Sequence, residues 1–329
     1  MGDERASTRC FVCDALERRR RADGRTLCLW CGAAWEPGFD KKQSLLRSAL
    51  SSRLVAGAVN GLGDDDGRGR WHLDSYTLRI AATRAGLWLI PGEGTTVSGH
   101  ARDPASGTLV PLHRFEAARI TAVCLARAND PACETALNLV ARQFDAVVVM
   151  LDGASDAAAF SDASLSRNVQ IVRRSLNGDF GAQRTAAHAH ADTDWLFHID
   201  LDETLSPGVL ATLPQLATAA HQAGLRAVGF QRCNLVDGMW SDHFPDTQYR
   251  LVHRDVTFAG HVHERPDACD SYATTTVALT GPLLHHLACD RVVARRRTYD
   301  ALGQTADRHA DDGALLRPFD AMSPLIMRA

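Results

Sequence analysis

The chain has 329 residues, of which 45% are hydrophobic and 23% are charged, and this composition excludes a protein that is disordered over most of its length. Its formal net charge of -3 lacks the basic excess typical of proteins that bind nucleic-acid backbones, so no nucleic-acid partner is expected. No apolar run approaches the roughly 20 residues that span a bilayer, and the first residues lack the apolar core of a signal peptide, so we expect a cytoplasmic protein.

Two closely spaced cysteine pairs stand near the N-terminus. Cys10 and Cys13 form one C-x2-C pair and Cys28 and Cys31 form the other, a spacing that lets four thiolates surround one metal ion. The doubled motif favours a structural zinc ribbon over residues 1–39, because so short a segment cannot bury enough apolar surface to fold alone. A rubredoxin-like iron site and a redox-active C-x2-C pair remain as competing interpretations.

Residues 40–118 carry no recognisable chemistry. Apolar residues recur at helical spacing over residues 43–54, which predicts a short amphipathic helix. Residues 61–69 are rich in glycine and aspartate and predict a connector. Short apolar runs over residues 71–112 are separated by turn-forming pairs, which predicts a set of β-hairpins. We therefore expect a helix followed by a β-rich segment.

From residue 119 to residue 290, apolar strands alternate with helices, which predicts a doubly wound, mostly parallel α/β sheet. The run Asp200-Leu201-Asp202-Glu203 directly follows the fourth expected strand, and Asp152 follows the second. Because ligands of such sheets bind beyond the carboxyl ends of the strands, these acidic residues are expected to face one site. The expected strands are residues 120–125, 146–151, 169–172 and 195–199. One expected helix begins near Pro131, and a second covers residues 180–191.

Three stretches of this unit resemble glycosyltransferase family 2, and within it the bacterial enzymes that extend lipopolysaccharide core and related glycans. They read GDFGAQRTAAHAHADTDWLFHIDLDE at residues 178–203, FPDTQYRLVH at residues 244–253 and FAGHVHE at residues 258–264. The resemblance covers roughly residues 120–286. It implies a GT-A fold and transfer of a sugar from a nucleotide-diphosphate donor, most often a UDP-sugar, to a glycan or lipid-linked acceptor.

Asp200 and Asp202 form a D-x-D pair, whose two carboxylates suit a divalent metal. Two carboxylates on a turn at a strand end can hold Mg²⁺ or Mn²⁺, and such a metal neutralises the diphosphate as it leaves. The resemblance implies that both aspartates lie at the ribose, the metal and the phosphates. It further implies that Asp152 lies near the nucleotide base and that Gln183 and Arg184 lie near the nucleotide.

An inverting transfer, which the resemblance implies, also needs a carboxylate that deprotonates the acceptor hydroxyl. Glu264 is the leading candidate for this general base, because the resemblance puts it on the acceptor side, and Asp246 is the reserve. Arg250 is expected to bind phosphate or to support Asp246. Trp240 and Phe244 are candidates either for lining the acceptor groove or for core packing.

Histidines follow two of these motifs. His261 and His263 lie two positions apart, so on an extended strand they share one face, as ligands, acceptor contacts or ordinary hydrogen-bonded side chains. His285 and His286 follow an apolar run, and the family often carries a histidine near this point. The resemblance therefore makes one of these two a candidate to complete the metal site.

Residues 291–329 are expected to form a C-terminal helical tail, which begins with a basic helix. The arginine runs at residues 18–21 and 295–297 fit a solvated helix face, and they also leave open a peripheral contact with an anionic membrane surface at the inner face. The expected organisation is thus a ribbon (1–39), a segment of unknown role (40–118), a GT-A domain (119–290) and a tail (291–329).

Two other functions are compatible with parts of the sequence. A sugar nucleotidyltransferase also uses a parallel sheet and a metal-binding carboxylate, but residues 126–130 lack the glycine-rich loop that normally follows its first strand. The second alternative is a non-catalytic zinc-ribbon binding protein with a degenerate GT-A domain. The presence of Asp200, Asp202 and Glu264 argues against it.

Overall fold

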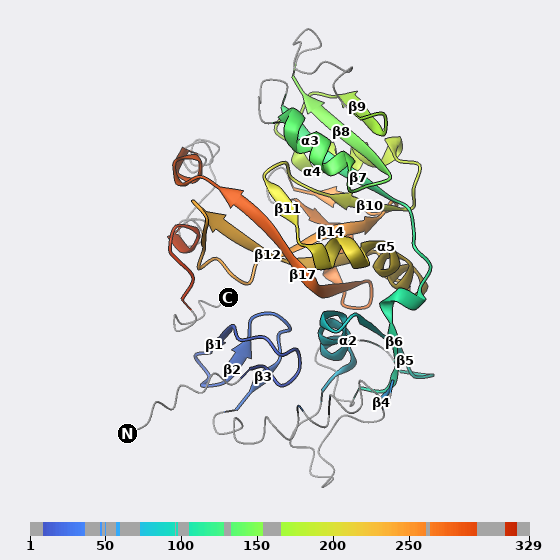
Figure 1. Cartoon of the computed structure of the whole chain (residues 1–329), viewed down its shortest axis with the longest axis vertical. Helices are drawn as coiled ribbons and strands as arrows, with labels where there is room; N and C mark the ends of the chain where they lie inside the picture. Colours follow the sequence, from blue (N-terminus) through green and yellow to red (C-terminus); the bar gives the residue numbers. More distant parts are fainter. Residues whose placement is uncertain are drawn as a thin grey trace.

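The computed structural model describes residues 9–36, 47, 50, 57–59, 73–95, 97, 105–127, 133–153, 166–260, 264–294 and 313–320. The first of these ranges, residues 9–36, is called the N-terminal ribbon below. It holds three short antiparallel strands, β1 (Arg18–Arg20), β2 (Thr26–Cys28) and β3 (Ala34–Trp35). In Figure 1 the N-terminal ribbon (blue) lies below one end of the large sheet, and helix α2 lies beside it.

The middle segment is a small sheet with one helix. β4 (Ala58–Val59), β6 (Gly107–Pro111) and β5 (Leu87–Pro91) pair antiparallel in that order, which confirms the β-rich prediction for this part of the segment. The prediction of hairpins was wrong for α2 (Ser75–Arg84). Asp74 caps this helix by accepting a 2.8 Å hydrogen bond from the backbone N–H of Thr77. The helix predicted at residues 43–54 and the connector at residues 61–69 lie almost entirely outside the described residues.

A mixed α/β sheet forms the main body and confirms the predicted fold class. Its strands run in the order β11-β17-β12-β14-β10-β7-β8-β9, and β13 pairs with β12. β10, β7, β8 and β9 are parallel to one another, whereas β14 runs antiparallel to both of its neighbours, β10 and β12. The strands are β7 (Ile120–Arg127), β8 (Ala146–Asp152), β9 (Val169–Arg173), β10 (Trp195–His198), β11 (Glu203–Leu205), β12 (Ala227–Val236), β13 (Met239–Trp240), β14 (Thr247–His253) and β17 (Thr275–Leu287).

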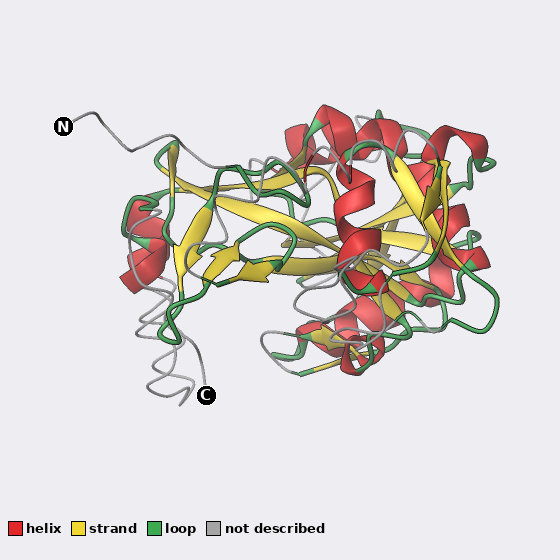
Figure 2. Cartoon of the chain, turned by 90° about the horizontal axis from the view of Figure 1, so that it is seen from below, coloured by secondary structure: helices red, strands yellow, loops and turns green. Residues whose placement is uncertain are grey.

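Helices cover both faces of this sheet (Figure 2). α3 (Cys133–Ala141) and α5 (Pro207–Gln222) pack with one set of alternating strand residues, among them Ala122 and Val149. α4 (Phe180–Ala187), continued by the 3-10 turn η4 (His188–His190), packs with the opposite set, among them Val123 and Val148. Side chains alternate between the two faces of a strand, so both faces of these central strands are buried.

The last described segments return to the far end of β12. After β17 the chain is helical over residues 289–294, the start of the predicted basic helix, whose remainder lies outside the described residues. Residues 313–320 then lie against the β13 region, where Ser241 forms a bridge with Pro318. The shorter elements of the middle and late chain are η2 (Leu112–Arg114), β15 (Phe258–Ala259), β16 (Arg265–Pro266) and η5 (Asp267–Asp270). No helix among the described residues has the length and apolar character to cross a bilayer.

Candidate functional site

The acidic run at residues 200–203 lies at the carboxyl end of β10. Ile199 N–H donates to the carbonyl oxygen of Val123 in β7 over 3.0 Å, which fixes the point where the chain leaves the sheet. A turn follows, closed by a 2.9 Å hydrogen bond from Glu203 N–H to the carbonyl oxygen of Asp200. Asp152, at the end of β8, pairs with Arg127 at the same edge of the sheet. The parallel strands therefore direct both acidic positions to one edge.

Asp200 lies between two buried arginines. Arg184 of α4 donates through Nη2 to Oδ1 of Asp200 at 2.8 Å, and Arg250 of β14 donates through Nη2 to Oδ2 at 2.7 Å. Both carboxylate oxygens thus accept from a guanidinium. Arg184 precedes β10 in the sequence and Arg250 follows it. Both arginines are buried, whereas the Asp200 side chain is 32% exposed, so the carboxylate between them is reachable from solvent.

Glu264 joins this group through Arg184. The Nε atom of Arg184 donates to Oε1 of Glu264 at 2.6 Å. The segment that leads to Glu264 is held close to α4, because Gly181 N–H donates to the carbonyl oxygen of Gly260, and a Cβ at Gly181 would lie only 2.8 Å from that oxygen. The predicted sites His261 and His263, just before Glu264, lie outside the described residues.

The ionic contacts continue from Arg250 towards β12. Arg250 Nη2 also donates to Oε1 of Glu203, which accepts a second bond from Arg232 Nη1 at 3.0 Å. Arg232 Nε then donates to Oδ2 of Asp246 at 2.9 Å. Glu203, Arg232 and Asp246 therefore connect the D-x-D turn to the start of β14 through one line of charge-assisted hydrogen bonds.

A polar branch returns from Asp246 to Asp202. Asn234 Nδ2 donates to Oδ2 of Asp246 at 2.9 Å, and Asn234 Oδ1 lies 2.7 Å from Nδ1 of His285. The other ring nitrogen of His285, Nε2, lies 3.4 Å from Oδ2 of Asp202. Since the amide oxygen of Asn234 only accepts, Nδ1 of His285 is the donor in this contact, and Nε2 is the ring nitrogen that faces Asp202.

The charges around the D-x-D turn shift the pKa values of its members. Burial alone would raise the pKa of Asp200, but Arg250 and Arg184 outweigh it and hold that pKa well below its usual range. Burial also works against ionisation of Asp246, yet Arg232 keeps its pKa below the usual value. Burial by itself would lower the pKa of Arg250, and the neighbouring Asp200 and Glu203 raise it instead. These groups are therefore ionised together at neutral pH.

A second, smaller group lies at the end of β8 and β9. Asp152 Oδ1 accepts a 2.9 Å hydrogen bond from the backbone N–H of Leu176. Gln183 of α4 donates from Nε2 to the carbonyl oxygen of Arg174 at 2.9 Å and accepts from the Arg174 guanidinium. Asp152 and Gln183 are thus held beside the loop that follows β9, away from the direct contacts of Asp200.

The structure therefore divides the predicted site residues into two groups. Arg184, Asp200, Asp202, Asp246, Arg250 and Glu264 belong to one continuous set of contacts, and Asp152 and Gln183 belong to the smaller group. The connecting residues Arg232 and Asn234 received no role from the sequence, and Glu203 was noted only as part of the acidic run. Polar residues at alternate positions in the second half of strand β12 are the signal that would have pointed to Arg232 and Asn234, although Gln231 beside them is polar as well.

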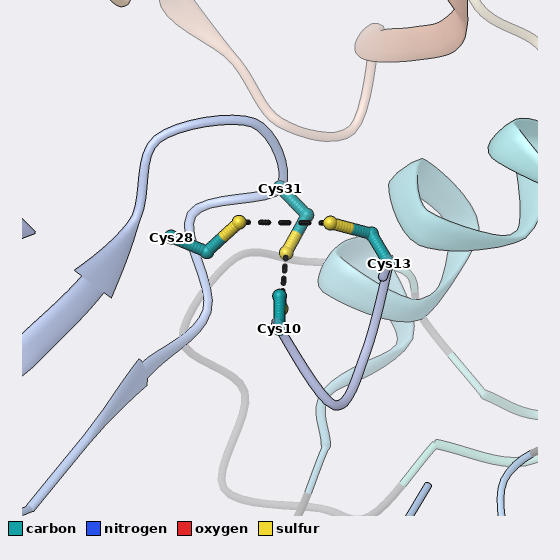
Figure 3. Close-up of side chains that lie close together, drawn as sticks. All are labelled: Cys10, Cys13, Cys28 and Cys31. Atoms are coloured by element: carbon teal, nitrogen blue, oxygen red, sulfur yellow. Dashed lines mark hydrogen bonds between the residues drawn. The ribbon is translucent and has the colours of Figure 1, made fainter. Parts of the chain in front are cut away.

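The four N-terminal cysteines converge on one point (Figure 3). Their sulfur atoms all lie within 4.8 Å of one another, all four side chains are buried, and none forms a disulfide. The Sγ atoms of Cys10 and Cys31 are 3.7 Å apart, and those of Cys13 and Cys28 are 3.5 Å apart. A tetrahedron of sulfurs about 2.3 Å from a zinc ion has edges of about 3.8 Å, so this cluster fits zinc.

Comparison with known proteins gives little beyond the fold. No protein-family model matches the sequence, and no curated protein is significantly similar to it. Among solved structures, S. aureus TarS matches 52% of this chain and 36% of its own, with 12% identity and a TM-score of 0.36. S. aureus TarS 1-349 in complex with UDP-GlcNAc matches 51% of this chain and 58% of its own, again with 12% identity and a TM-score of 0.36.

Another solved structure is Rv0371C of Mycobacterium tuberculosis H37Rv in complex with manganese. It matches 41% of this chain and 70% of its own, with 20% identity and a TM-score of 0.28. This chain spans between 36% and 58% of the length of the two TarS chains given above. Likeness at this level concerns the arrangement of strands and helices, and it leaves substrates and metals to the residues of this chain.

Proposed function

We propose that this protein is a metal-dependent glycosyltransferase of the GT-A type that uses a nucleotide-diphosphate sugar. The observation that carries the proposal is the turn after β10, where Asp202 Oδ2 lies 3.4 Å from Nε2 of His285 while Arg184 and Arg250 lie beside Asp200. Carboxylate oxygens with one imidazole suit Mn²⁺ or Mg²⁺, and the two arginines supply positive charge for a diphosphate. The sequence resemblance to glycosyltransferase family 2 supports the same function.

The two aspartates of the D-x-D turn then have different roles. Asp202 and His285 are the ligands that would hold the divalent metal, which neutralises the leaving diphosphate. Asp200 holds the guanidinium groups of Arg184 and Arg250 in place, because both of its oxygens accept from them. Asn234 fixes the orientation of the His285 ring through Nδ1, the second contact that metal-binding histidines usually make.

Glu264 is the proposed general base. In an inverting transfer it accepts the proton of the acceptor hydroxyl, the hydroxyl oxygen bonds to the anomeric carbon, and the bond from that carbon to the diphosphate oxygen breaks. Asp246 suits this role less well, because it accepts bonds from Arg232, Asn234 and Gln248. Those three donors occupy both oxygens of Asp246 and stabilise its ionised form, whereas the contact of Glu264 is with Arg184 through Oε1.

The proposal also assigns the catalytic domain, the two substrates and a membrane contact. Residues 119–290 form the catalytic domain, with Asp152 and Gln183 on the side of the nucleotide base. The donor is a UDP-sugar and the acceptor is a glycan or a lipid-linked glycan. A peripheral membrane contact through the arginines at residues 295–297 belongs to the same proposal and lies outside the described residues.

Calorimetry of UDP binding with and without Mn²⁺ tests the proposal. Binding to the wild-type protein should require the metal, and Asp202→Asn should weaken binding in Mn²⁺ on the order of 10- to 100-fold. Asp192→Asn is the matched control, since its side chain is 68% exposed. Undiminished, metal-independent binding by the Asp202 variant would refute the metal role. Pyrophosphate release from UTP and a sugar phosphate would favour a nucleotidyltransferase instead.

A further inference from the structure

The N-terminal ribbon presents one buried charge to the rest of the molecule. Arg19, the middle residue of β1, is 6% exposed, whereas its neighbour Arg20 is exposed, as expected when strand side chains alternate. The Arg19 guanidinium forms an ion pair with Asp242, whose side chain is 3% exposed. Its Nη2 atom also lies 3.4 Å from the backbone carbonyl oxygens of Asp242 and Asp320. One arginine of the ribbon therefore contacts two distant segments of the chain.

Asp242 is the point where three segments meet. Besides Arg19 of the ribbon, it faces Arg317, whose Nη2 atom donates to Oδ2 over 3.3 Å. The backbone N–H of Asp320 donates to Oδ1 over 3.3 Å, and the backbone N–H of Asp242 donates to the carbonyl oxygen of Arg317 over 2.7 Å. Residues 241–246 connect β13 to β14, and we call them the 241–246 loop. The ribbon and the C-terminal segment thus hold the first residues of this loop.

Aromatic side chains pack around this ion pair. The rings of Trp30 of the ribbon and Phe244 of the 241–246 loop lie 5.0 Å apart, and Phe319 stacks on Trp240 at 4.2 Å. Phe244 is buried with Leu29 of the ribbon in one apolar cluster. The ribbon therefore packs against Phe244 through Leu29 and Trp30, and Arg19 is the buried one of the two arginines that pair with Asp242.

The 241–246 loop ends at a member of the candidate site. Its last residue, Asp246, accepts from Nε of Arg232, and Arg232 reaches Glu203 beside the D-x-D turn. The backbone of the loop is tied to β12 as well, because Arg232 N–H donates to the carbonyl oxygen of Asp246 over 2.9 Å. A change in the path of the loop would therefore change the direction in which Asp246 holds the Arg232 side chain.

We propose that Arg19 is a positioning residue of the transferase site and that the N-terminal ribbon forms the wall of its acceptor side. Arg19 holds Asp242, the ribbon holds Phe244, and the fixed 241–246 loop keeps Asp246 against Arg232. Assigning the loop to the acceptor side rests on the proposed function. The claim that Arg19 fixes the loop rests on the contacts alone.

Hydrogen–deuterium exchange of the full-length, metal-loaded protein tests the structural step. In Arg19→Gln, amides of residues 241–250 should exchange about tenfold faster or more, because the buried Asp242 carboxylate keeps only the exposed Arg317 as a cation and local opening becomes easier. Arg20→Gln should match the wild type, and Arg19→Lys should restore part of the protection, since lysine keeps the charge without the guanidinium fork. Equal exchange in Arg19→Gln and Arg20→Gln would overturn the proposal.

Donor binding and turnover test the functional step on the same variants. We expect Arg19→Gln to keep the UDP–Mn²⁺ affinity of the wild type within about twofold while release of UDP from UDP-sugars slows about tenfold, because Arg19 acts through the 241–246 loop, which the proposal assigns to the acceptor side. Unchanged turnover despite faster loop exchange would refute the functional step. If the wild type itself fails to bind UDP–Mn²⁺, the proposed function fails, and the exchange rates still decide the role of Arg19. Asp242→Asn, which removes the partner charge, should reproduce the exchange result should Arg19→Gln not fold.

Discussion

Arg184 donates from Nε to Oε1 of Glu264 at 2.6 Å, and this single contact joins the proposed base to a residue expected at the nucleotide. The same guanidinium reaches Asp200 through Nη2. A diphosphate bound beside Arg184 would compete with Glu264 for the N–H groups of the Arg184 guanidinium. Binding of the nucleotide sugar would then release the Glu264 carboxylate, which could accept a proton.

The first prediction is that Glu264→Gln slows transfer and leaves donor binding nearly unchanged. The amide keeps the shape of the side chain and can accept from Arg184, but it cannot take a proton at neutral pH. General-base catalysis contributes on the order of 10²- to 10⁴-fold, so UDP release from a UDP-sugar should fall by about that factor. Single-turnover kinetics with a panel of UDP-sugars measures the effect.

Asp246→Asn is the matched comparison. Asp246 accepts hydrogen bonds from Arg232, Asn234 and Gln248. The main effects of Asp246→Asn should therefore be a lower stability and a displaced Arg232, and not the loss of a proton acceptor. We expect a smaller effect on turnover than that of Glu264→Gln. Abolished transfer in the Asp246 variant together with normal transfer in the Glu264 variant would exchange the two roles, and normal transfer in both would rule out either residue as the base.

The second prediction concerns the stability contributed by Arg250. This buried guanidinium bridges Asp200 and Glu203, so Arg250→Gln leaves the buried carboxylate of Glu203 and the partly exposed one of Asp200 without their shared cation. Removing one partner of a buried ion pair typically costs about 3–5 kcal/mol in the free energy of unfolding. Urea denaturation should show a loss of this size. Arg254→Gln, at a side chain that is 43% exposed, should change stability by less than about 1 kcal/mol.

The third prediction is that the purified protein carries about one zinc ion per chain, held by the four clustered cysteines. Elemental analysis measures it directly. Cys28→Ser should lose the metal and the protection of ribbon amides from exchange, whereas UDP–Mn²⁺ binding by the sheet should persist. Cys289→Ser, at an exposed cysteine, should change none of these. Iron in place of zinc, or a Cys10–Cys13 disulfide with no metal, would overturn the assignment.

The fourth prediction is a loss of stability on mild acidification caused by His188. Burial lowers the pKa of His188, whose Nε2 lies 3.0 Å from Nε2 of His198. The pKa of a histidine in the unfolded chain is about 6.5, so below this pH the unfolded chain binds a proton that the native state does not bind. The free energy of unfolding should therefore fall by up to about 1.4 kcal/mol per pH unit between pH 7 and pH 5.

Denaturant titrations at several pH values compare three proteins for this prediction. His188→Gln should show a shallower decline between pH 7 and pH 5 than the wild type. His190→Gln, at an exposed position on the same turn, should follow the wild-type curve. Identical slopes in the His188 variant and the wild type would mean that this histidine is not kept neutral by the fold.

Much of the fold could be predicted from the sequence where the apolar runs are fully buried. β7, β8 and β10 begin at the expected residues, because strands covered on both faces read as continuous apolar segments. The edge strand β9 also begins where expected, although it is only partly buried. Residues 75–84 were misassigned because α2 buries polar side chains. Arg79 is 2% exposed in this helix, and its guanidinium lies over the ring of Trp88 at 5.1 Å. A buried arginine interrupts the apolar periodicity that marks a helix.

The site was less predictable, because its connections join strands that lie far apart in sequence. Asn234 and His285 are adjacent only through the parallel pairing of β12 with β17, which aligns these two residues directly. Neither the pairing nor its register can be read from local patterns. The D-x-D residues could be recognised locally because they follow β10, whereas the bridging role of Arg232 needed the order of the strands.

The position of the N-terminal ribbon also bears on the order in which the chain is made. Its residues are made before the other described segments, yet Arg19 contacts Asp242 and Asp320, 223 and 301 positions later. Until those segments are synthesised, the face formed by Leu29 and Trp30 has no partner from the loop or the C-terminal segment. The four cysteines can gather a metal early, but the buried face of the ribbon is fully covered only after residues 313–320 have been made.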